Sequence, residues 1–316
     1  MRKNPRILPT WVAICGAISV GALTAMQARV NGQLGVALDD GFVAAFISFG
    51  SGFVILIVLS ALFPAGRGGV RHLVDGVRAA TIPWWMLLGG AAGAFAVATQ
   101  GLSVGIIGVG LFTVGMVAGQ TVNGLVLDRT GYGPGGVVAV TMPRVIGAAI
   151  ALVAVGSVFV GDTVQGIPVW MLILPFFAGA GIAWQQATNG RLRQQVGTPL
   201  TATLVNFAGG TTFLAVAAVI DVAIVGMPEA LPAEAWIYAG GALGVVYIFL
   251  SAALVQHTGV LLLGLGSVVG LLVTAVILDA IWPTASSPPL LTQIVIVAIA
   301  LLSVVVAAAP WRLRRP

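Results

Sequence analysis

Two pairs of side-chain amides are the residues of this chain best suited to binding chemistry. Gln27 and Asn31 are four positions apart, and Gln185 and Asn189 repeat that spacing, so each pair would share one face of a helix. A side-chain amide donates and accepts hydrogen bonds without carrying a charge, which suits contact with a small organic solute. The same amides could instead bond to neighbouring helices, because a polar group that faces lipid is costly. The spacing is compatible with both roles.

Three further residues extend the set of candidate substrate contacts. Gln120 and Asn123 form a pair at i and i+3, and Trp184 directly precedes the second amide pair. An indole could stack on an organic substrate, although a single aromatic residue more often packs inside the protein. The predicted substrate-binding set is Gln27, Asn31, Gln120, Asn123, Trp184, Gln185 and Asn189.

Motifs for enzymatic or cofactor chemistry are absent from the sequence. Two histidines and one cysteine cannot supply a metal-binding set, and there is no phosphate-binding loop of the ATPase type. The glycine-rich stretch 105–110 joins two apolar segments and lacks the strand–turn–helix setting of a dinucleotide-binding loop. We therefore expect a protein that is not an enzyme and that has no cofactor, no bound metal and no nucleic acid partner.

Charged residues inside the apolar segments are few, which bears on ion coupling. No Asp or Glu lies in the middle of a segment; Asp128 closes one, and Arg129 or Arg144 could offset its charge. Arg144 could also serve only as a topology anchor near the membrane surface. Protons or another coupling ion are candidate partners, but the sequence offers no clear carrier for them.

Composition indicates an integral membrane protein. Hydrophobic residues make up 59% of the 316 positions and charged residues 7%, with a mean hydropathy of +1.09. A soluble domain of this length could not bury so much apolar surface. The net charge of +5 is therefore not a sign of nucleic acid binding. In a membrane protein the positions of the charged residues along the chain are informative, because they indicate the topology. The lipid bilayer is an expected partner.

Ten apolar segments are long enough to cross a bilayer as helices, each near or above the ~20 residues required. They cover 11–33, 42–62, 84–104, 107–128, 138–160, 168–192, 200–222, 235–255, 259–282 and 289–309. With the N-terminus in the cytoplasm, most basic residues fall on the cytoplasmic side and most acidic residues on the other, as the positive-inside rule requires. We expect an all-α integral membrane protein with ten transmembrane helices and both termini cytoplasmic.

The chain also carries an internal repeat. The stretch 27–34 has a second copy at 185–192, with Gln, Asn, Gly and Leu in the same register. The correspondence continues along both halves: Phe49 matches Phe207, Trp85 matches Trp236, and the Gly-xxx-Gly pairs 89/93 and 115/119 match 240/244 and 266/270. Each copy would hold five helices, and because five is odd, the second copy would enter the membrane upside down. The pattern predicts two inverted five-helix repeats, residues 1–162 and 163–316, an architecture of many secondary transporters.

Two features add to this scheme. Apolar residues of the link 63–83 recur at helical spacing, which predicts a short interfacial helix; a basic loop that fixes the topology is the alternative. No helix breaker follows Asn31 before Gly41, or Asn189 before Gly197, so the first helix of each repeat should run for about 28 residues, ~42 Å. A helix of that length must tilt or protrude, and tilt would bring its amide pair toward a central cavity.

Ten predicted helices in two inverted halves resemble the drug/metabolite transporter (DMT) superfamily. The Gln-xxx-Asn-Gly-x-Leu segment of each half, with the stretch 44–52 (AAFISFGSG) that follows the first copy, is similar to the YdcZ-like family of bacterial inner-membrane proteins. The second copy departs from the first at Asn206, which stands where the first has Ser48. The resemblance covers nearly the whole chain and implies the fold, a bacterial inner-membrane location and export, without indicating a ligand.

Together these features predict a secondary-active transporter that moves a small organic solute or metabolite by alternating access, with export as the expected direction. A passive solute facilitator is an alternative, and a non-transporting membrane partner or sensor protein is another. The chain could also form a homodimer.

Overall fold

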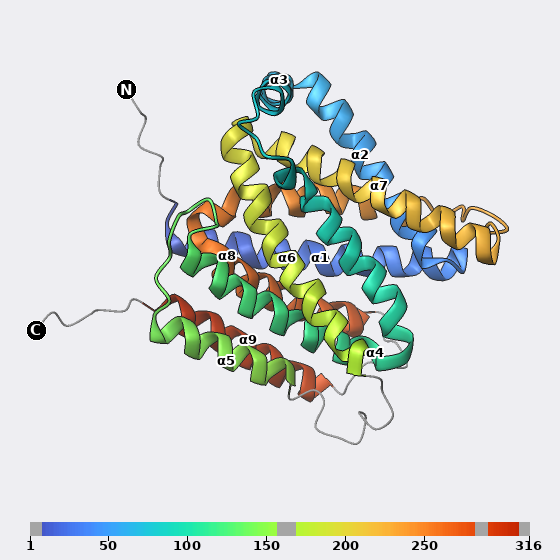
Figure 1. The fold of residues 1–316 in the computed structure, drawn as a ribbon. Coiled ribbons are helices and arrows are strands. Elements are labelled where there is room, and N and C mark those ends of the chain that lie inside the picture. Colours follow the sequence, from blue (N-terminus) through green and yellow to red (C-terminus); the bar gives the residue numbers. More distant parts are fainter. Residues whose placement is uncertain (1–7, 157–168, 282–289, 310–316) are drawn as a thin grey trace, which may run out of the picture.

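A computed structural model describes residues 8–156, 169–281 and 290–309, and every regular element in these ranges is helical (Figure 1). The elements are α1 (Thr10–Leu38), α2 (Gly41–Leu62), α3 (Pro64–Arg78), the 3-10 turn η1 (Trp84–Leu88), α4 (Gly89–Thr130), α5 (Met142–Gly156), α6 (Val169–Val196), α7 (Pro199–Val225), the 3-10 turn η3 (Ala235–Tyr238), α8 (Gly240–Ile281) and α9 (Leu290–Ala308). The all-α prediction is thus confirmed for the described residues. The predicted boundary between the two repeats, at 162/163, lies outside them.

The first helix of each repeat has the predicted length, since α1 contains 29 residues and α6 contains 28. Both helices end at a tight joint with the next helix. After α1, Asp39 adopts a left-handed conformation with φ 51°, and the carboxylate of Asp40 accepts hydrogen bonds from the first N–H groups of α2. After α6, Gly197 has φ 80°, and the hydroxyl of Thr198 accepts from the N–H of Leu200.

The chain reverses direction within α4. Its first part runs antiparallel to α6 and its second part runs parallel to it, as four contacts show: Gly89 with Asn189, Gly93 with Gln185, Gly115 with Pro175, and Asn123 with Ala180. Figure 1 shows the ribbon of α4 turning back on itself between these parts. The predicted segments 84–104 and 107–128 therefore correspond to the two arms of one element.

The same reversal occurs within α8, at Gly259. This residue has φ 72° and ψ 174°, a conformation that glycine adopts without strain. Before it, α8 runs antiparallel to α1, and after it the two run parallel: Gly240 contacts Asn31, Gly244 contacts Gln27, Gly266 contacts Ala17, and Gly270 contacts Ile18 and Ala22. The predicted segments 235–255 and 259–282 thus form a second folded-back pair.

Contacts between the repeats are reciprocal. The helix α1 packs along α8 while α6 packs along α4, and α2 packs on α7 while α5 packs on α9. Where α2 packs on α7, the rings of Phe49 and Phe207 lie 5.2 Å apart. Gly52 faces the ring of Phe207, and Gly210 faces the ring of Phe49. Residues that match in the sequence repeat therefore meet matching partners in space.

Small residues allow the closest of these approaches. Gly119 of α4 lies against the carbonyl oxygen of Phe176 in α6, and Gly270 of α8 lies against the carbonyl oxygen of Ile18 in α1. A side chain at either position would separate the two backbones, as at the small-residue interfaces of membrane helices. Both glycines belong to Gly-xxx-Gly pairs of the sequence repeat, so these pairs lie at close helix contacts.

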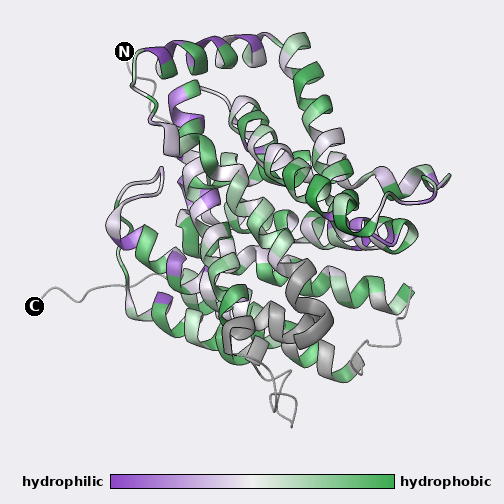
Figure 2. Ribbon diagram, turned by 45° about the vertical axis from the view of Figure 1, so that its right-hand side comes forward, coloured by the Kyte–Doolittle hydropathy of each residue, from purple (hydrophilic) through white to green (hydrophobic). Residues whose placement is uncertain are grey.

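The outer surface is apolar over the long helices. Large hydrophobic side chains such as Val216 (58% exposed) and Val305 (67% exposed) point outward. Four of the described helical stretches are long and apolar enough to cross a membrane by themselves: Thr10–Leu38, Gly41–Leu62, Pro199–Val225 and Ala235–Leu278. Figure 2 shows the long helices mostly hydrophobic, with hydrophilic residues gathered along α3 at the top of the molecule.

The link 63–83 contains the predicted helix, α3, rather than only a basic loop. It packs close to its neighbours because Gly66 lies against Ser60 of α2 and Gly69 lies against Thr198 and Thr201. The same side of the molecule holds the start of α1, the α4–α5 link, the turn within α8 and the end of α9 (Figure 1). The α1–α2 joint and the end of α7 lie on the opposite side.

Candidate functional site

One group of polar side chains, here called the first amide cluster, comprises Gln27, Asn31 and Ser48. They lie on α1 and α2 and face Gly240 and Gly244 of α8. The amide of Gln27 is buried, and its Nε2 donates to the carbonyl oxygen of Gly240 over 2.9 Å. The Oδ1 atom of Asn31 lies directly against Gly240. The predicted amide pair on α1 therefore faces protein rather than lipid.

The second amide cluster comprises Gln185, Asn189 and Asn206, on α6 and α7. Both Gln185 Nε2 and Asn189 Nδ2 donate to Asn206 Oδ1, over 2.7 and 2.9 Å. The cluster faces Gly89 and Gly93 of α4, the repeat counterparts of the glycines at the first cluster. Each repeat thus supplies an amide cluster that rests on two glycines of the other repeat.

Unpaired atoms distinguish the two clusters. In the first, Asn31 Oδ1 and Ser48 Oγ are buried without a hydrogen-bond partner among the described residues. In the second, the unpaired buried atom is Asn206 Nδ2. Alignment of the two repeat copies placed Asn206 opposite Ser48. It did not indicate that Asn206 accepts hydrogen bonds from both amides of its cluster.

The other predicted residues lie apart from the clusters. Asn123 Nδ2 donates to the carbonyl oxygen of Ala180 over 2.6 Å, and Gln120 is buried against Gly264. Trp184 packs on an apolar core that includes Leu127. The seven predicted residues therefore occupy three places: one at each amide cluster, and one on α4 and α6 outside the clusters.

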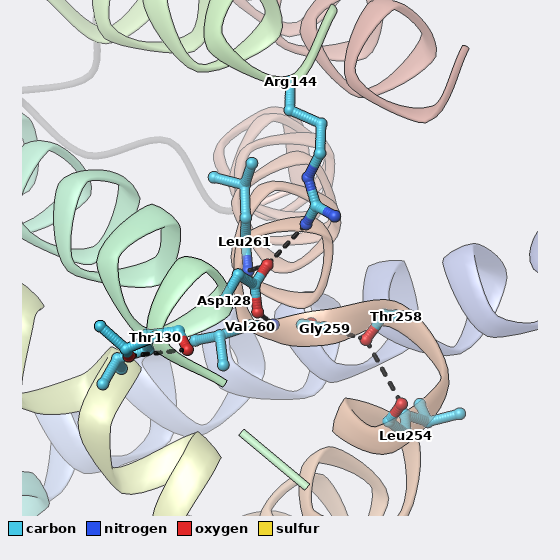
Figure 3. A network of polar contacts seen from close by, with 9 residues as sticks. Asp128, Thr130, Arg144, Leu254, Thr258, Gly259, Val260 and Leu261 are labelled. Carbon is cyan, nitrogen blue, oxygen red and sulfur yellow. Dashed lines mark hydrogen bonds and ion pairs between the residues drawn. The ribbon is translucent and has the colours of Figure 1, made fainter. Parts of the chain in front are cut away.

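A buried ion pair joins three helices (Figure 3). Arg144 of α5 contacts Asp128 at the end of α4 over 2.6 Å, and both side chains are almost fully buried. The Asp128 carboxylate also accepts from the backbone N–H groups of Val260 (2.7 Å) and Leu261 (3.2 Å). These N–H groups begin the second arm of α8, where a negative charge offsets the helix dipole. Of the two partners predicted for Asp128, Arg144 is the one in contact, so it is more than a topology anchor.

A cation–aromatic group lies where η1, α6 and the α4–α5 link meet. The guanidinium of Arg191 stands 5.7 Å from the ring centre of Trp85 and 5.0 Å from that of Tyr132. The hydroxyl of Tyr132 is 2.9 Å from that of Thr188. Sequence reasoning did not identify this group, because its members come from three separate segments with no shared spacing.

Two surface grooves are lined by none of the residues named in these groups. One, of about 410 Å³, is lined by apolar residues that include Leu59 and Phe249. The other, of about 530 Å³, lies between α3 and α7 and includes Arg78. Neither is lined by any of the seven predicted residues. The described residues contain no group of three or more His, Cys, Asp or Glu that could hold a metal ion.

Comparisons with known proteins give one family and one fold. A family model described as "Putative inner membrane exporter, YdcZ" matches residues 12–157 and 170–307. No curated protein matches the chain. A solved crystal structure of a protein aligns with 94% of this chain and 95% of its own length, at a TM-score of 0.63 and 15% sequence identity. At that identity the likeness concerns the fold alone.

Proposed function

The chain belongs to the YdcZ family of inner membrane exporters in the DMT group, and from this premise we propose that it exports a small organic solute by secondary-active, alternating-access transport. The observation that carries the proposal is the reciprocal packing of the two amide clusters on the glycines of the opposite repeat. Transporters with inverted repeats place their substrate sites at the interface between the repeats. The clusters lie at that interface.

The proposal includes ten membrane crossings, in two inverted repeats at 1–162 and 163–316, with both termini in the cytoplasm. The reversals within α4 and α8 support this number, because each would divide one continuous element into two crossings. The loops expected in the cytoplasm gather on one side of the molecule (Figure 1). The α1–α2 joint and the end of α7, expected outside, gather on the other.

In the proposed mechanism the two repeats rock against each other along the α1–α8, α4–α6 and α2–α7 contacts. Glycine-lined faces suit such sliding because they present few interlocking side chains. Gln27, Asn31, Gln185 and Asn189 would exchange protein partners for the solute as the interface opens. Gln120, Asn123 and Trp184 would line the path between the two clusters.

A passive facilitator is the second candidate. Neither amide cluster contains a carboxylate among its described members, and a coupled proton needs a group that titrates. The buried Asp128 is bound to Arg144 and to two backbone N–H groups, which favours a structural role for this residue. A direct test of ion coupling therefore distinguishes the coupled transporter from the facilitator.

Purified protein in liposomes, with a panel of organic solutes and an imposed pH gradient, tests the proposal. Uphill flux supports a coupled transporter, and flux that is only downhill supports the facilitator. Absence of flux for every solute, together with a stable bound partner protein, would support the non-transporting alternative. Gln27→Leu and Asn189→Leu should abolish flux at unchanged expression, whereas Gln33→Leu, at an exposed position of α1, should retain it.

A further inference from the structure

We infer that the first amide cluster is the binding site for an N–H group of the transported solute, with Asn31 Oδ1 and Ser48 Oγ as the accepting atoms. The inference rests on the proposed transport function and specifies the chemistry of its substrate: a solute with an amine or amide nitrogen that carries hydrogen. It also assigns unequal roles to two clusters that the sequence repeat makes equivalent.

The first step is that two oxygen atoms of this cluster lack partners. Asn31 Oδ1 and Ser48 Oγ are both inaccessible to solvent and form no hydrogen bond among the described residues. Ser48 is only 2% exposed as a whole residue. Both atoms adjoin Gly240, since each lies close to where a Cβ of that residue would stand. A buried polar atom without a partner destabilises the protein, so a neighbouring pair of them calls for an explanation.

The second step is that the residue equivalent to Ser48 is paired internally in the other cluster. There the longer Asn206 replaces Ser48, and its Oδ1 accepts from both Gln185 and Asn189. The unpaired atom is then Asn206 Nδ2, which is a donor. The buried unpaired groups therefore differ between the clusters: an amide oxygen and a hydroxyl in the first, and an amide N–H group in the second.

The third step concerns the ligand that suits the first cluster. Asn31 Oδ1 only accepts hydrogen bonds, whereas the Ser48 hydroxyl can both donate and accept, and Gln27 Nε2 already donates to the carbonyl oxygen of Gly240. A carboxylate or phosphate group has no hydrogen to donate, so it would leave Asn31 Oδ1 without a partner. A metal ion is also a poor match, since calcium and magnesium take six or more oxygen ligands. An N–H group supplies the hydrogen that Asn31 Oδ1 lacks, and the Ser48 hydroxyl can accept from the same nitrogen.

Thiol-specific reagents of matched size test this assignment in detergent-purified protein, where both faces are accessible. Ser48→Cys and Asn206→Cys would each be placed in a Cys15→Ser background, because Cys15 is exposed and is the one cysteine of the sequence. The probes are the ethylammonium, ethyltrimethylammonium and ethylsulfonate methanethiosulfonates. The first two are cations, but only ethylammonium carries N–H groups. Rates are normalised to the reaction of each probe with free 2-mercaptoethanol.

At Ser48→Cys we expect ethylammonium to react about tenfold faster than trimethylammonium, because Asn31 Oδ1 remains to accept its N–H. Adding Asn31→Leu should remove that preference, which separates hydrogen bonding from reagent size. At Asn206→Cys no preference for ethylammonium is expected. The inference is overturned if Ser48→Cys does not react, if the preference survives Asn31→Leu, or if Asn206→Cys shows it too. Solute flux by the wild type is measured separately, so a failed inference and a failed transport function give different results.

Discussion

The carboxylate of Asp128 accepts a hydrogen bond from the backbone N–H of Val260 over 2.7 Å. This bond ties the end of α4 to the first residues after the turn at Gly259, and Arg144 holds the same carboxylate from α5. One side chain of the first repeat thereby fixes the reversal point of the second. Its removal should weaken the contact between the repeats at one side of the molecule.

Replacement of Asp128 by Ala should lower the free energy of unfolding by about 3–5 kcal/mol, because Arg144 would remain buried without its counter-charge. Thermal unfolding in detergent measures this loss, with exposed Asp75→Ala on α3 as the control. Adding Arg144→Leu should recover part of the stability, since no lone charge is then buried. Equal stability of the Asp128→Ala and Asp75→Ala proteins would contradict a structural role for the ion pair.

Introducing a methyl group at the glycine contacts should separate the paired helices. A Cβ at Gly119 would overlap the carbonyl oxygen of Phe176, and a Cβ at Gly270 would overlap that of Ile18. Each Gly→Ala change should cost about 1–3 kcal/mol through overpacking. Gly50→Ala is the matched control, because no atom lies within 4 Å of its added methyl group. Its stability should stay constant or rise slightly, and a similar loss at all three positions would argue against the close helix contacts.

The cation–aromatic group should appear as an energetic coupling between Arg191 and Trp85. A double-mutant cycle with Arg191→Gln and Trp85→Leu should yield about 0.5–2 kcal/mol, the range for a cation on an indole face. The repeat provides a control in Trp236, which matches Trp85 in sequence but is 53% exposed. The cycle of Arg191→Gln with Trp236→Leu should give a coupling near zero. Comparable coupling in both cycles would mean that the measured energy does not come from the ring contacts.

Single cysteines should report the proposed orientation of the chain in the membrane. In a Cys15→Ser background, Cys introduced at Asp39 should react with an impermeant thiol reagent from the outside of intact cells. Cys introduced at Arg193 or Asp75 should react only after the membrane is opened, because both positions are expected in the cytoplasm. Labelling of Asp39→Cys and Arg193→Cys from the same side would refute the inversion of the two repeats.

Much of the helical framework follows from local sequence patterns. The unbroken runs after Asn31 and Asn189 predicted the long α1 and α6, and the helical spacing of apolar residues in 63–83 predicted α3. The repeat predicted which residues would be equivalent, and the equivalent Phe49 and Phe207 contact each other. Such features depend on periodicity or on self-similarity, and both can be read from one sequence.

Contacts between distant segments could not be derived in the same way. The acceptor role of Asn206 depends on how α6 and α7 face each other, and amide residues carry no mark of their partners. Asp128 could be matched with Arg144 by charge, but the backbone groups of Val260 and Leu261 became its partners only through the turn at Gly259. The sequence placed a break between the segments 235–255 and 259–282, but it did not indicate that the backbone at this break would face Asp128.

The contact between Gln27 and Gly240 has a consequence for biogenesis. Its two residues are separated by 213 positions, so at ~5–20 residues per second the ribosome needs on the order of 10–40 s to deliver the acceptor after the donor. During that interval the amide of Gln27 must bond to water, lipid headgroups or the insertion machinery. Closure of the first amide cluster is thus a late event in assembly, and it cannot occur until most of the polypeptide has entered the membrane.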